Sequence, residues 1–470
     1  MHEPISDRYR CPERFVRTSL SAPLSPENGY FRFGRDLVCY GRSCAGNPAV
    51  SSDGRPPDVL HEVRTDQPEA RLPFDLTQVV DNLTHERYVN SHGASGNAPN
   101  PVLSKLYYSV RPFLPASLRI PLQRLYFRGW EKIPFPAWPL DLTVERLLET
   151  VLLQCMKSRG IDTVPFIWFW PDDASSAVIL THDVETAEGL DSCPSLMAID
   201  ESFGFRSAFQ IVPEKRYPVT EALLTEIRER GHEINVQDLN HDGNLFRDRH
   251  QFLSRVKAIN EYGRLWGAKG FRSAILYRNL NWYDALEFQY DMSVPNVGHL
   301  DPQRGGCCTV FPYFIGGILE LPLTTTQDYS LFHILREHRI ALWKAQARLV
   351  KKEHGLLSLL THPDYLLNRP AQSIYRDLLA FLAELESEHK VWIALPNQVN
   401  KWWRQRSEMA LVPDGNGWRI EGPGKERASL AYAKPDGDRL IYTREASGRY
   451  RKALPKKSAA KLLKAKLKTS

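Results

Sequence analysis

Between about residue 175 and residue 406, short apolar runs alternate with amphipathic segments, and this alternation constrains the fold more than any other feature. Runs of four to six residues rich in Val, Ile and Leu are typical of buried strands. Strands that alternate with helices form a mostly parallel sheet, open or closed into a barrel. The eight runs lie at 178–181, 208–212, 233–237, 270–274, 290–294, 319–323, 356–361 and 391–395. This number of strands favours a (β/α) barrel.

Helices are predicted wherever apolar residues recur at helical spacing. Thr143 is the expected N-cap of the first such segment, and Gly231 is a typical C-terminal signal for the second. The four predicted helices cover 143–158, 220–230, 331–353 and 372–388.

The composition divides the chain into four parts. Residues 1–170 begin rich in Pro, Gly, Ser and Asn, so we expect an N-terminal extension that is irregular and then helical. Residues 171–406 hold the predicted barrel. Short strand-like runs around Gly/Asp turns predict a small β appendage over 407–448, and residues 449–470 form a basic tail.

The net charge of +6 belongs to the tail, which contains nine Lys and Arg residues and no acid, so the rest of the chain carries about −3. A body of this charge does not favour binding to nucleic acid. The tail also has leucines among its lysines. It is expected either to be disordered or to lie on an anionic membrane surface, where a lipid-linked glycan would be a natural substrate.

The cysteines and the N-terminus indicate the compartment. The seven cysteines are odd in number and scattered, which is not a disulfide framework and agrees with a reducing environment. No apolar run is long enough to span a bilayer, and the chain does not start with a basic and then apolar export signal. We therefore expect a cytoplasmic protein. Its tail could also bring it into contact with the inner face of the membrane.

Ionisable residues follow the first strand-like run in the sequence Thr181-His182-Asp183-Val184-Glu185. In α/β folds the loops after strands gather catalytic groups at one end of the sheet. The alternative is that Asp183 or Glu185 only caps the next helix. Polar residues at the ends of four further strands favour a site over a cap, and they lie in Gly231–His241, Gly270–Arg272, Asp291–Pro295 and Leu359–His362.

In this order the motifs resemble those of the polysaccharide deacetylases, the NodB-like carbohydrate esterases of family four. The resemblance covers about half of the chain and implies a distorted (β/α) barrel. It also implies a hydrolase that uses a divalent metal, expected to be Zn²⁺, to remove an acetyl group from an N-acetylated sugar or glycan in bacterial cell-surface polysaccharide metabolism. A metal can acidify water and polarise a carbonyl, which suits amide hydrolysis.

The resemblance also implies roles for single residues. Asp183 would be the general base, Arg272 would hold it in place, and His362 would be the acid that protonates the leaving amine. Glu185 and His241 would bind the metal.

Two positions depart from the family pattern. Val184 stands where the usual motif has a metal-binding Asp, but relatives with Asp-x-Asp fit Asp183 and Glu185. Gln237 stands where a histidine ligand belongs, and an amide oxygen is a poor zinc ligand beside imidazole. Gln237 itself, His182 or Asp238 could complete the ligand set.

Three hypotheses remain. The first is the metal-dependent deacetylase, which the combination of Asp183, Arg272 and His362 favours. The second is a non-catalytic descendant of the barrel that binds a glycan or a biosynthetic partner, which the two departures favour. The third is a barrel that hydrolyses a cyclic amide without metal.

Overall fold

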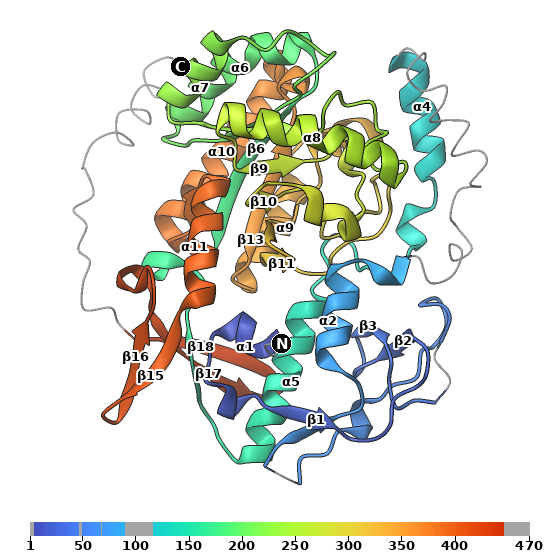
Figure 1. The fold of residues 1–470 in the computed structure, drawn as a ribbon, viewed down its shortest axis with the longest axis vertical. Helices are drawn as coiled ribbons and strands as arrows, with labels where there is room; N and C mark the ends of the chain where they lie inside the picture. The colour runs from blue at the N-terminus through green and yellow to red at the C-terminus, as the bar shows by residue number, and fades with distance from the viewer. Residues whose placement is uncertain (1–3, 47–48, 67, 90–115, 446–470) are drawn as a thin grey trace, which may run out of the picture.

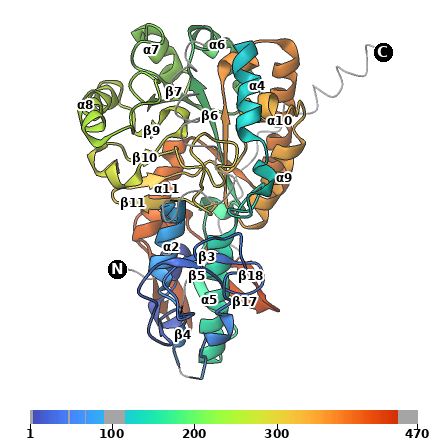
Figure 2. The ribbon, with the colours of Figure 1, turned by 90° about the vertical axis from the view of Figure 1, so that its right-hand side faces the viewer.

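The computed structural model describes residues 4–46, 49–66, 68–89 and 116–445, and these form two lobes (Figure 1). The barrel lobe consists of residues 171–408. The base lobe consists of residues 4–89, 143–170 and 409–445, with the gaps given above, so both ends of the described chain contribute to it (Figure 2). Helix α4 (Ala116–Phe127) lies along the outside of the barrel lobe.

The barrel lobe is built on one nine-stranded sheet in the order β11-β12-β10-β9-β8-β7-β6-β13, with β14 paired to β6. β11 runs antiparallel to β12, and the other strands pair in parallel. Its strands are β6 (Ala177–Val184), β7 (Ala208–Ile211), β8 (Glu233–Gln237), β9 (Gly270–Arg272), β10 (Tyr290–Asp291), β11 (Tyr313–Ile315), β12 (Ile318–Glu320), β13 (Leu356–Thr361) and β14 (Trp392–Ala394). The predicted parallel sheet is confirmed.

Strand β6 lies at the centre of the lobe, and all eight of its residues are buried. It pairs with β13 along one edge, and with β14 and then β7 along the other. A strand covered on both faces needs a continuous apolar run, which is why 178–181 could be recognised from sequence.

Side chains close the barrel between β12 and β13. The hydroxyl groups of Thr324 and Thr325, in the chain after β12, donate to the backbone oxygens of Leu356 and Ser358 at 2.8 Å each. The backbone N–H of Ser358 donates in turn to the Thr324 hydroxyl at 2.8 Å. Because no backbone ladder joins these two strands among the described residues, the barrel is distorted, as the resemblance implies. The last predicted strand, 391–395, corresponds to β14, which pairs with the first part of β6 and does not help to close the barrel.

Three of the four predicted helices form: 143–158 in the base lobe, and 220–230 and 372–388 on the barrel, which further helices also cover. The predicted helix over 331–353 is wrong in its first half, since only α9 forms there, preceded by a short π-helical turn, η9 (Ser330–Ile334). Four consecutive charged or ionisable residues, 336–339, interrupt the apolar stripe between the two elements. The helices of the lobe are α6 (Ala187–Ser202), α7 (Glu221–Glu229), α8 (Arg249–Trp266), α9 (Ala341–Lys352), α10 (Arg369–His389) and α11 (Pro396–Glu408).

The base lobe joins elements from distant parts of the sequence. Strand β17 of the predicted appendage pairs antiparallel with β5, which precedes the barrel. The Tyr9 and Tyr442 hydroxyl groups lie 2.9 Å apart, and Arg406 donates to the backbone oxygen of Arg8 at 2.9 Å. The elements are α1 (Pro4–Tyr9), α2 (Leu76–Thr84), α5 (Thr143–Arg159), β1 (Thr18–Leu20), β2 (Gly29–Arg32), β3 (Val38–Gly41), β4 (Ala70–Leu72), β5 (Val164–Ile167), β15 (Ala410–Asp414), β16 (Gly417–Glu421), β17 (Leu430–Asp436) and β18 (Arg439–Arg444).

Helix α5 shows how the N-terminal extension is fixed to the barrel. Thr143 is its first residue and not its N-cap, which is Leu142. The carboxylate of Asp141 accepts from the Thr143 backbone N–H at 2.8 Å, while the Asp141 backbone exchanges hydrogen bonds with the side chain of Asn296, in the loop after β10.

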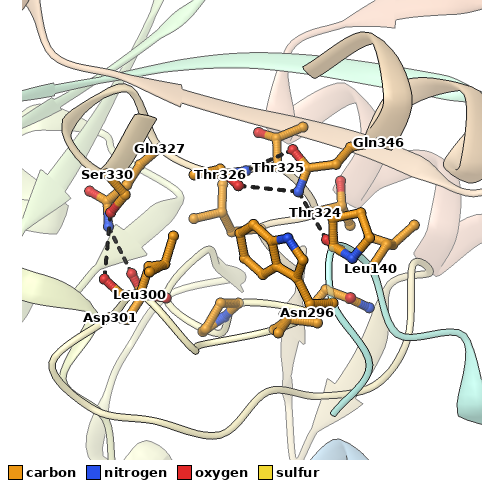
Figure 3. A pocket seen from close by; sticks show the side chains of 15 residues that line it. Leu140, Asn296, Leu300, Asp301, Thr324, Thr325, Thr326, Gln327, Ser330 and Gln346 are labelled. Atoms are coloured by element: carbon orange, nitrogen blue, oxygen red, sulfur yellow. Dashed lines mark hydrogen bonds between the residues drawn. The ribbon is translucent and has the colours of Figure 1, made fainter. Parts of the chain in front are cut away.

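Trp138 and Leu140 pack beside that loop, around a cavity of about 20 Å³ (Figure 3). A cavity of this size holds about one water molecule. The extension therefore fills this side of the barrel mouth. No helix within the described ranges has the length and apolarity needed to cross a membrane.

Candidate active site

The alternation of side chains along β6 decides which residues enter the barrel. The side chains of Thr181 and Asp183 point inward, toward Arg272 on β9. Glu185, two positions on, continues this inner row just past the strand. His182 lies between them and points outward to Asp200 on α6. The same alternation explains why Val184 is tolerated, since its position faces the helices and not the site.

Asp183 is held by two donors. Arg272 donates to one carboxylate oxygen at 2.6 Å, and the amide nitrogen of Gln237 on β8 lies 3.1 Å from the other. Arg272 is itself fully buried and fixed by the Thr181 hydroxyl and the Met292 backbone oxygen. Burial raises the pKa of Asp183, and the nearby Arg272 charge offsets this only in part. A buried carboxylate with a raised pKa is a better proton acceptor than a free one.

Glu185 lies at the centre of the cluster. One of its oxygens is 2.7 Å from His241 Nε2, 3.3 Å from the Gln237 amide nitrogen and 3.6 Å from His362 Nε2. Burial alone would raise the pKa of Glu185, but the two imidazoles outweigh burial and hold that pKa well below its usual range. Glu185 is therefore an anion at neutral pH, and its side chain is 20% exposed at the mouth of the site.

His362, directly after β13, is oriented by Asp328. The Asp328 carboxylate lies 2.6 Å from His362 Nδ1 and accepts from the His362 backbone N–H at 2.7 Å. Burial would lower the pKa of His362, but Asp328 and then Glu185 raise it well above its usual range. The imidazole is therefore protonated at neutral pH, and its Nε2 faces the site as a proton donor.

The donor set fits a divalent cation. Single ligand atoms of Asp183, Glu185 and His362 all lie within 4.8 Å of one another, but a protonated His362 has no lone pair for a metal, so the fit rests on Glu185 and His241. Ligand atoms that share one zinc ion, at about 2.1 Å each, lie at most about 4.2 Å apart, so small side-chain movements would suffice. His241 adds an imidazole beside Glu185. The amide oxygen of Gln237 is buried without a hydrogen-bond partner among the described residues, and a turn of the amide would present it to a cation.

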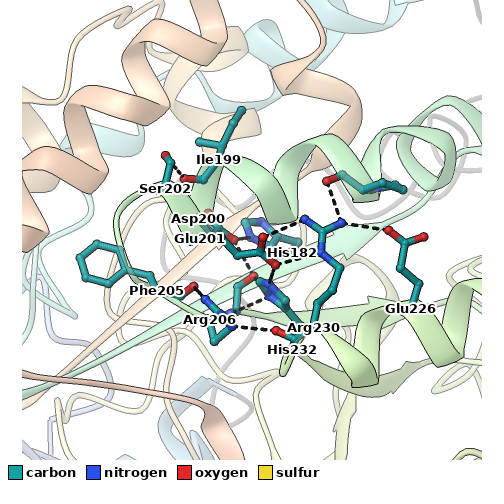
Figure 4. Close-up of polar contacts among 12 residues, drawn as sticks. His182, Ile199, Asp200, Glu201, Ser202, Phe205, Arg206, Glu226, Arg230 and His232 are labelled. Atoms are coloured by element: carbon teal, nitrogen blue, oxygen red, sulfur yellow. Dashed lines mark hydrogen bonds and ion pairs between the residues drawn. The ribbon is translucent and has the colours of Figure 1, made fainter. Parts of the chain in front are cut away.

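His182 does not join this cluster. Its Nε2 lies 3.2 Å from Asp200 (Figure 4). Its Nδ1 lies 2.8 Å from the Thr361 hydroxyl, so both ring nitrogens have partners. Asp200 also accepts from Ser207 and Tyr375 at 2.6 Å each. The network packs α6 and α10 against the outer face of the sheet and leaves no nitrogen for a metal in the barrel.

Of the residues expected from sequence, the structure brings six together: Asp183, Glu185, Gln237, His241, Arg272 and His362. Sequence reasoning missed Asp328. It lies five residues beyond the predicted strand 319–323, so the signal was its place after a strand end. The alternative ligand Asp238 has no hydrogen bond or ion pair with this cluster among the described residues. One of its carboxylate oxygens accepts a hydrogen bond from the Leu239 backbone N–H at 2.6 Å.

No family model matches the sequence, and no curated protein matches it either. Among solved structures, the chain is similar to one described as a polysaccharide deacetylase from Mycobacterium smegmatis, with 19% identity and a TM-score of 0.42 over 51% of this chain and 93% of that one. An allantoinase matches with 14% identity and a TM-score of 0.39 over 50% of this chain and 92% of the other.

A family 4 carbohydrate esterase from Streptomyces lividans, in complex with acetate, matches with 11% identity and a TM-score of 0.29 over 47% of this chain and 93% of that one. Each match covers about half of this chain and most of the solved chain. At these identities and TM-scores, the function has to be inferred from the site of this chain itself.

Proposed function

We propose that this protein is a metal-dependent hydrolase that removes the acetyl group from an N-acetylated sugar or glycan. The observation that carries the proposal is the pairing of opposite proton-transfer groups across one small site. Asp183 is a buried carboxylate with a raised pKa, and His362 is an imidazole kept protonated by Asp328. Amide hydrolysis needs such a base and such an acid on opposite sides of the scissile bond.

Each residue has a defined task in this scheme. Asp183 accepts a proton from the attacking water, while Arg272 and Gln237 fix the carboxylate through their hydrogen bonds. His362 donates its Nε2 proton to the amine nitrogen as the amide bond breaks. Asp328 is a positioning residue, because it sets the ring orientation and charge of His362 without facing the reacting atoms.

Glu185 and His241 are the proposed metal ligands, with the amide oxygen of Gln237 completing the set. A bound divalent ion would supply Lewis-acid chemistry, polarising the acyl carbonyl and making water more acidic. His241 now pairs with Glu185, and this pairing raises the His241 pKa against the effect of burial. Because a metal ligand must be the neutral ring, ion binding would compete with protonation of His241.

Two measurements test the proposal. The metal content of the purified protein, determined by elemental analysis after incubation with zinc, cobalt, nickel or manganese, should be near one ion per chain and should be lost in Glu185→Ala and His241→Ala. The loaded protein should release acetate from chitotetraose. Absence of bound metal with all four ions would refute the metal-dependent hydrolase.

One contact favours a second function, the metal-free hydrolysis of a cyclic amide. The Gln237 amide nitrogen lies 3.1 Å from Asp183 and 3.3 Å from Glu185, so N–H groups already satisfy both carboxylates. A carboxylate pair held in this way could act without a cation. Hydrolysis of a cyclic amide that persists in the presence of EDTA, without acetate release from sugars, would support this function.

The location and the partner are proposals as well. The basic tail, 449–470, lies outside the described residues. We propose that it binds anionic lipid on the inner face of the membrane and brings the site to a lipid-linked glycan. Sedimentation with vesicles containing phosphatidylglycerol should recover the full chain but not a chain that ends at residue 445.

A further inference from the structure

We propose that Arg255 on α8 is a positioning residue for His241, the candidate metal ligand that follows β8. Its guanidinium group holds residues 238–244, called the His241 turn here, in the way that a bound cation holds a calcium loop. The inference rests on the proposed function, because it concerns one ligand of that site. It extends the site from the barrel mouth to a helix on the outside of the barrel (Figure 1).

The sequence of the His241 turn has the spacing of a calcium loop. Asp238, Asn240 and Asp242 alternate along the turn, and Gly243 follows them. This pattern, D-x-N-x-D-G, is that of the first half of an EF-hand loop, in which oxygens at the first, third and fifth positions bind Ca²⁺. The twelfth position, where a bidentate Glu completes the calcium site, is Arg249. The turn therefore has oxygens arranged around a cation but lacks the ligand that completes a calcium site.

Arg255 supplies the positive charge. Its Nη1 donates to one carboxylate oxygen of Asp242 at 2.6 Å and to the side-chain oxygen of Asn240 at 3.3 Å. Its Nη2 donates to the other Asp242 oxygen at 2.7 Å. The planar guanidinium group matches a carboxylate in this bidentate way. The side chains of Arg255 and Asp242 are only 19% and 35% exposed, so water screens their attraction less than that of a surface pair.

The acceptors of Arg255 also hold the backbone of the turn. The Asn240 side-chain oxygen accepts from the Asp242 backbone N–H at 3.3 Å, and the Asp242 carboxylate accepts from the Asn244 backbone N–H at 2.9 Å. His241 lies between these two acceptors in the sequence. Arg255 therefore orients the same oxygens that bend the chain around His241.

The backbone of the turn needs this support. Asp238 and His241 have φ angles of 52° and 54°, in the left-handed region that is unfavourable for residues other than glycine. Such a conformation persists only where the surrounding structure holds it. In this conformation the Nε2 atom of His241 lies 2.7 Å from Glu185. A turn that relaxed would move the imidazole away from the other proposed ligand.

Helix α8 gives Arg255 a fixed base. Phe252, Val256 and Ile259 are buried on the side of α8 that packs against the barrel, and Arg255 lies beside them at helical spacing. Groups that orient a metal ligand from outside change metal affinity about 10- to 100-fold when they are removed. An effect at the lower end of this range is expected here, because Arg255 acts through the turn and not on the ring itself.

The test combines two measurements on the full chain. Zn²⁺ affinity is measured by competition with a chromophoric chelator, and hydrogen exchange of the His241 turn is measured in the metal-free protein. Arg255→Met should weaken Zn²⁺ binding about tenfold, since the ligand is no longer held in place. It should also speed exchange of the Asp242 and Asn244 backbone N–H groups about tenfold, because their acceptors are released. Arg255→Lys, which keeps the charge without the bidentate geometry, should lie between Arg255→Met and the wild type.

Arg230→Met is the matched control. Arg230 makes a bidentate pair with Glu201, at 2.9 and 3.0 Å, and the two side chains are 25% and 28% exposed (Figure 4). This variant removes a comparable ion pair from the end of α7 and should change neither the Zn²⁺ affinity nor the exchange of the turn. Urea unfolding of each variant measures any general loss of stability.

The outcomes separate this inference from the proposed function. Unchanged exchange in Arg255→Met would overturn the inference, and so would faster exchange with unchanged Zn²⁺ affinity, because the turn would then not position His241. Equal losses in Arg230→Met would overturn it as well, since they would reflect general destabilisation. A wild type that binds no Zn²⁺ would refute the proposed function, while the exchange of the turn would still decide whether Arg255 holds it.

Discussion

Among the described residues, two buried histidine–aspartate pairs lie on opposite faces of one sheet. They differ in the partner of the second ring nitrogen of the histidine. His362 pairs with Asp328 through Nδ1, and its Nε2 faces Glu185 and the mouth of the site. His182 pairs with Asp200 through Nε2, and the Thr361 hydroxyl occupies its Nδ1. His182 is fully buried, whereas the site around His362 opens beside the partly exposed Glu185.

The difference teaches that a buried His–Asp pair is not by itself a sign of catalysis. Fully satisfied polar networks stabilise a unique packing, and the network of His182, Asp200, Ser207 and Tyr375 does this for α6 and α10. A reactive pair needs one nitrogen that remains available to a substrate. Substitutions in the two pairs should therefore have opposite consequences for activity and stability.

The largest effect is expected from removing the base or the acid. Asp183→Asn or His362→Gln should reduce acetate release about 10²- to 10⁴-fold, because each substitution removes one general acid–base function. Acetate release at saturating metal is the measurement, and urea unfolding is the control for stability. Activity within threefold of wild type in either variant would contradict the assigned role.

On the outer face, Asp200→Ala should lower the free energy of unfolding by about 3–5 kcal/mol, since it leaves the buried His182, Ser207 and Tyr375 without their shared carboxylate partner. The acetate release of the folded fraction at low temperature should stay close to wild type. Urea unfolding measures the first effect, with the exposed Asp377→Ala on α10 as the matched control. An unchanged unfolding curve would show that the network does not stabilise the fold.

The pH profile separates the two pairs further. Activity should rise with pH as Asp183 loses its proton and fall again as His362 loses its own, and both pKa values are raised by their surroundings. Asp328→Asn removes the charge that raises the His362 pKa, so the alkaline limb should move to lower pH while the acid limb stays. A loss of activity that is equal at every pH would indicate a purely structural role for Asp328.

The smallest effect is expected at Thr361, whose hydroxyl group meets His182. Thr361→Val should cost about 1–2 kcal/mol of stability, because it leaves a buried ring nitrogen without its partner. The pH profile of acetate release should not shift, although Thr361 directly precedes His362. A shifted alkaline limb would show that the two pairs are coupled through β13.

Sequence reasoning predicted the strands that position the candidate site. Apolar runs identified β6 and β13, and Asp183 near the end of β6, Glu185 after it and His362 after β13 lie together in the barrel. The period of two along β6 would also have placed His182 on the outer face, because a residue next to Asp183 must point the other way.

Other parts could not be read in this way. Asp328 begins the short helical turn that continues into η9, between β12 and α9. It lies between the predicted strand 319–323 and the predicted helix 331–353, so neither predicted element included it. The packing of α4 against the η9 segment depends on contacts between residues about 200 positions apart, such as Arg124 and His333, and no local pattern encodes them.

The base lobe has a consequence for how the protein is made. The Tyr9 and Tyr442 hydroxyl groups are in contact although 433 positions separate them in the sequence. Strand β5 can pair only after β17 has been synthesised. At roughly 5–20 residues per second, a ribosome needs about 20–90 s to add the intervening chain. The barrel strands emerge during this interval, while Tyr9 and β5 still lack the contacts that Tyr442 and β17 supply. The base lobe is therefore completed only after the barrel strands have been synthesised.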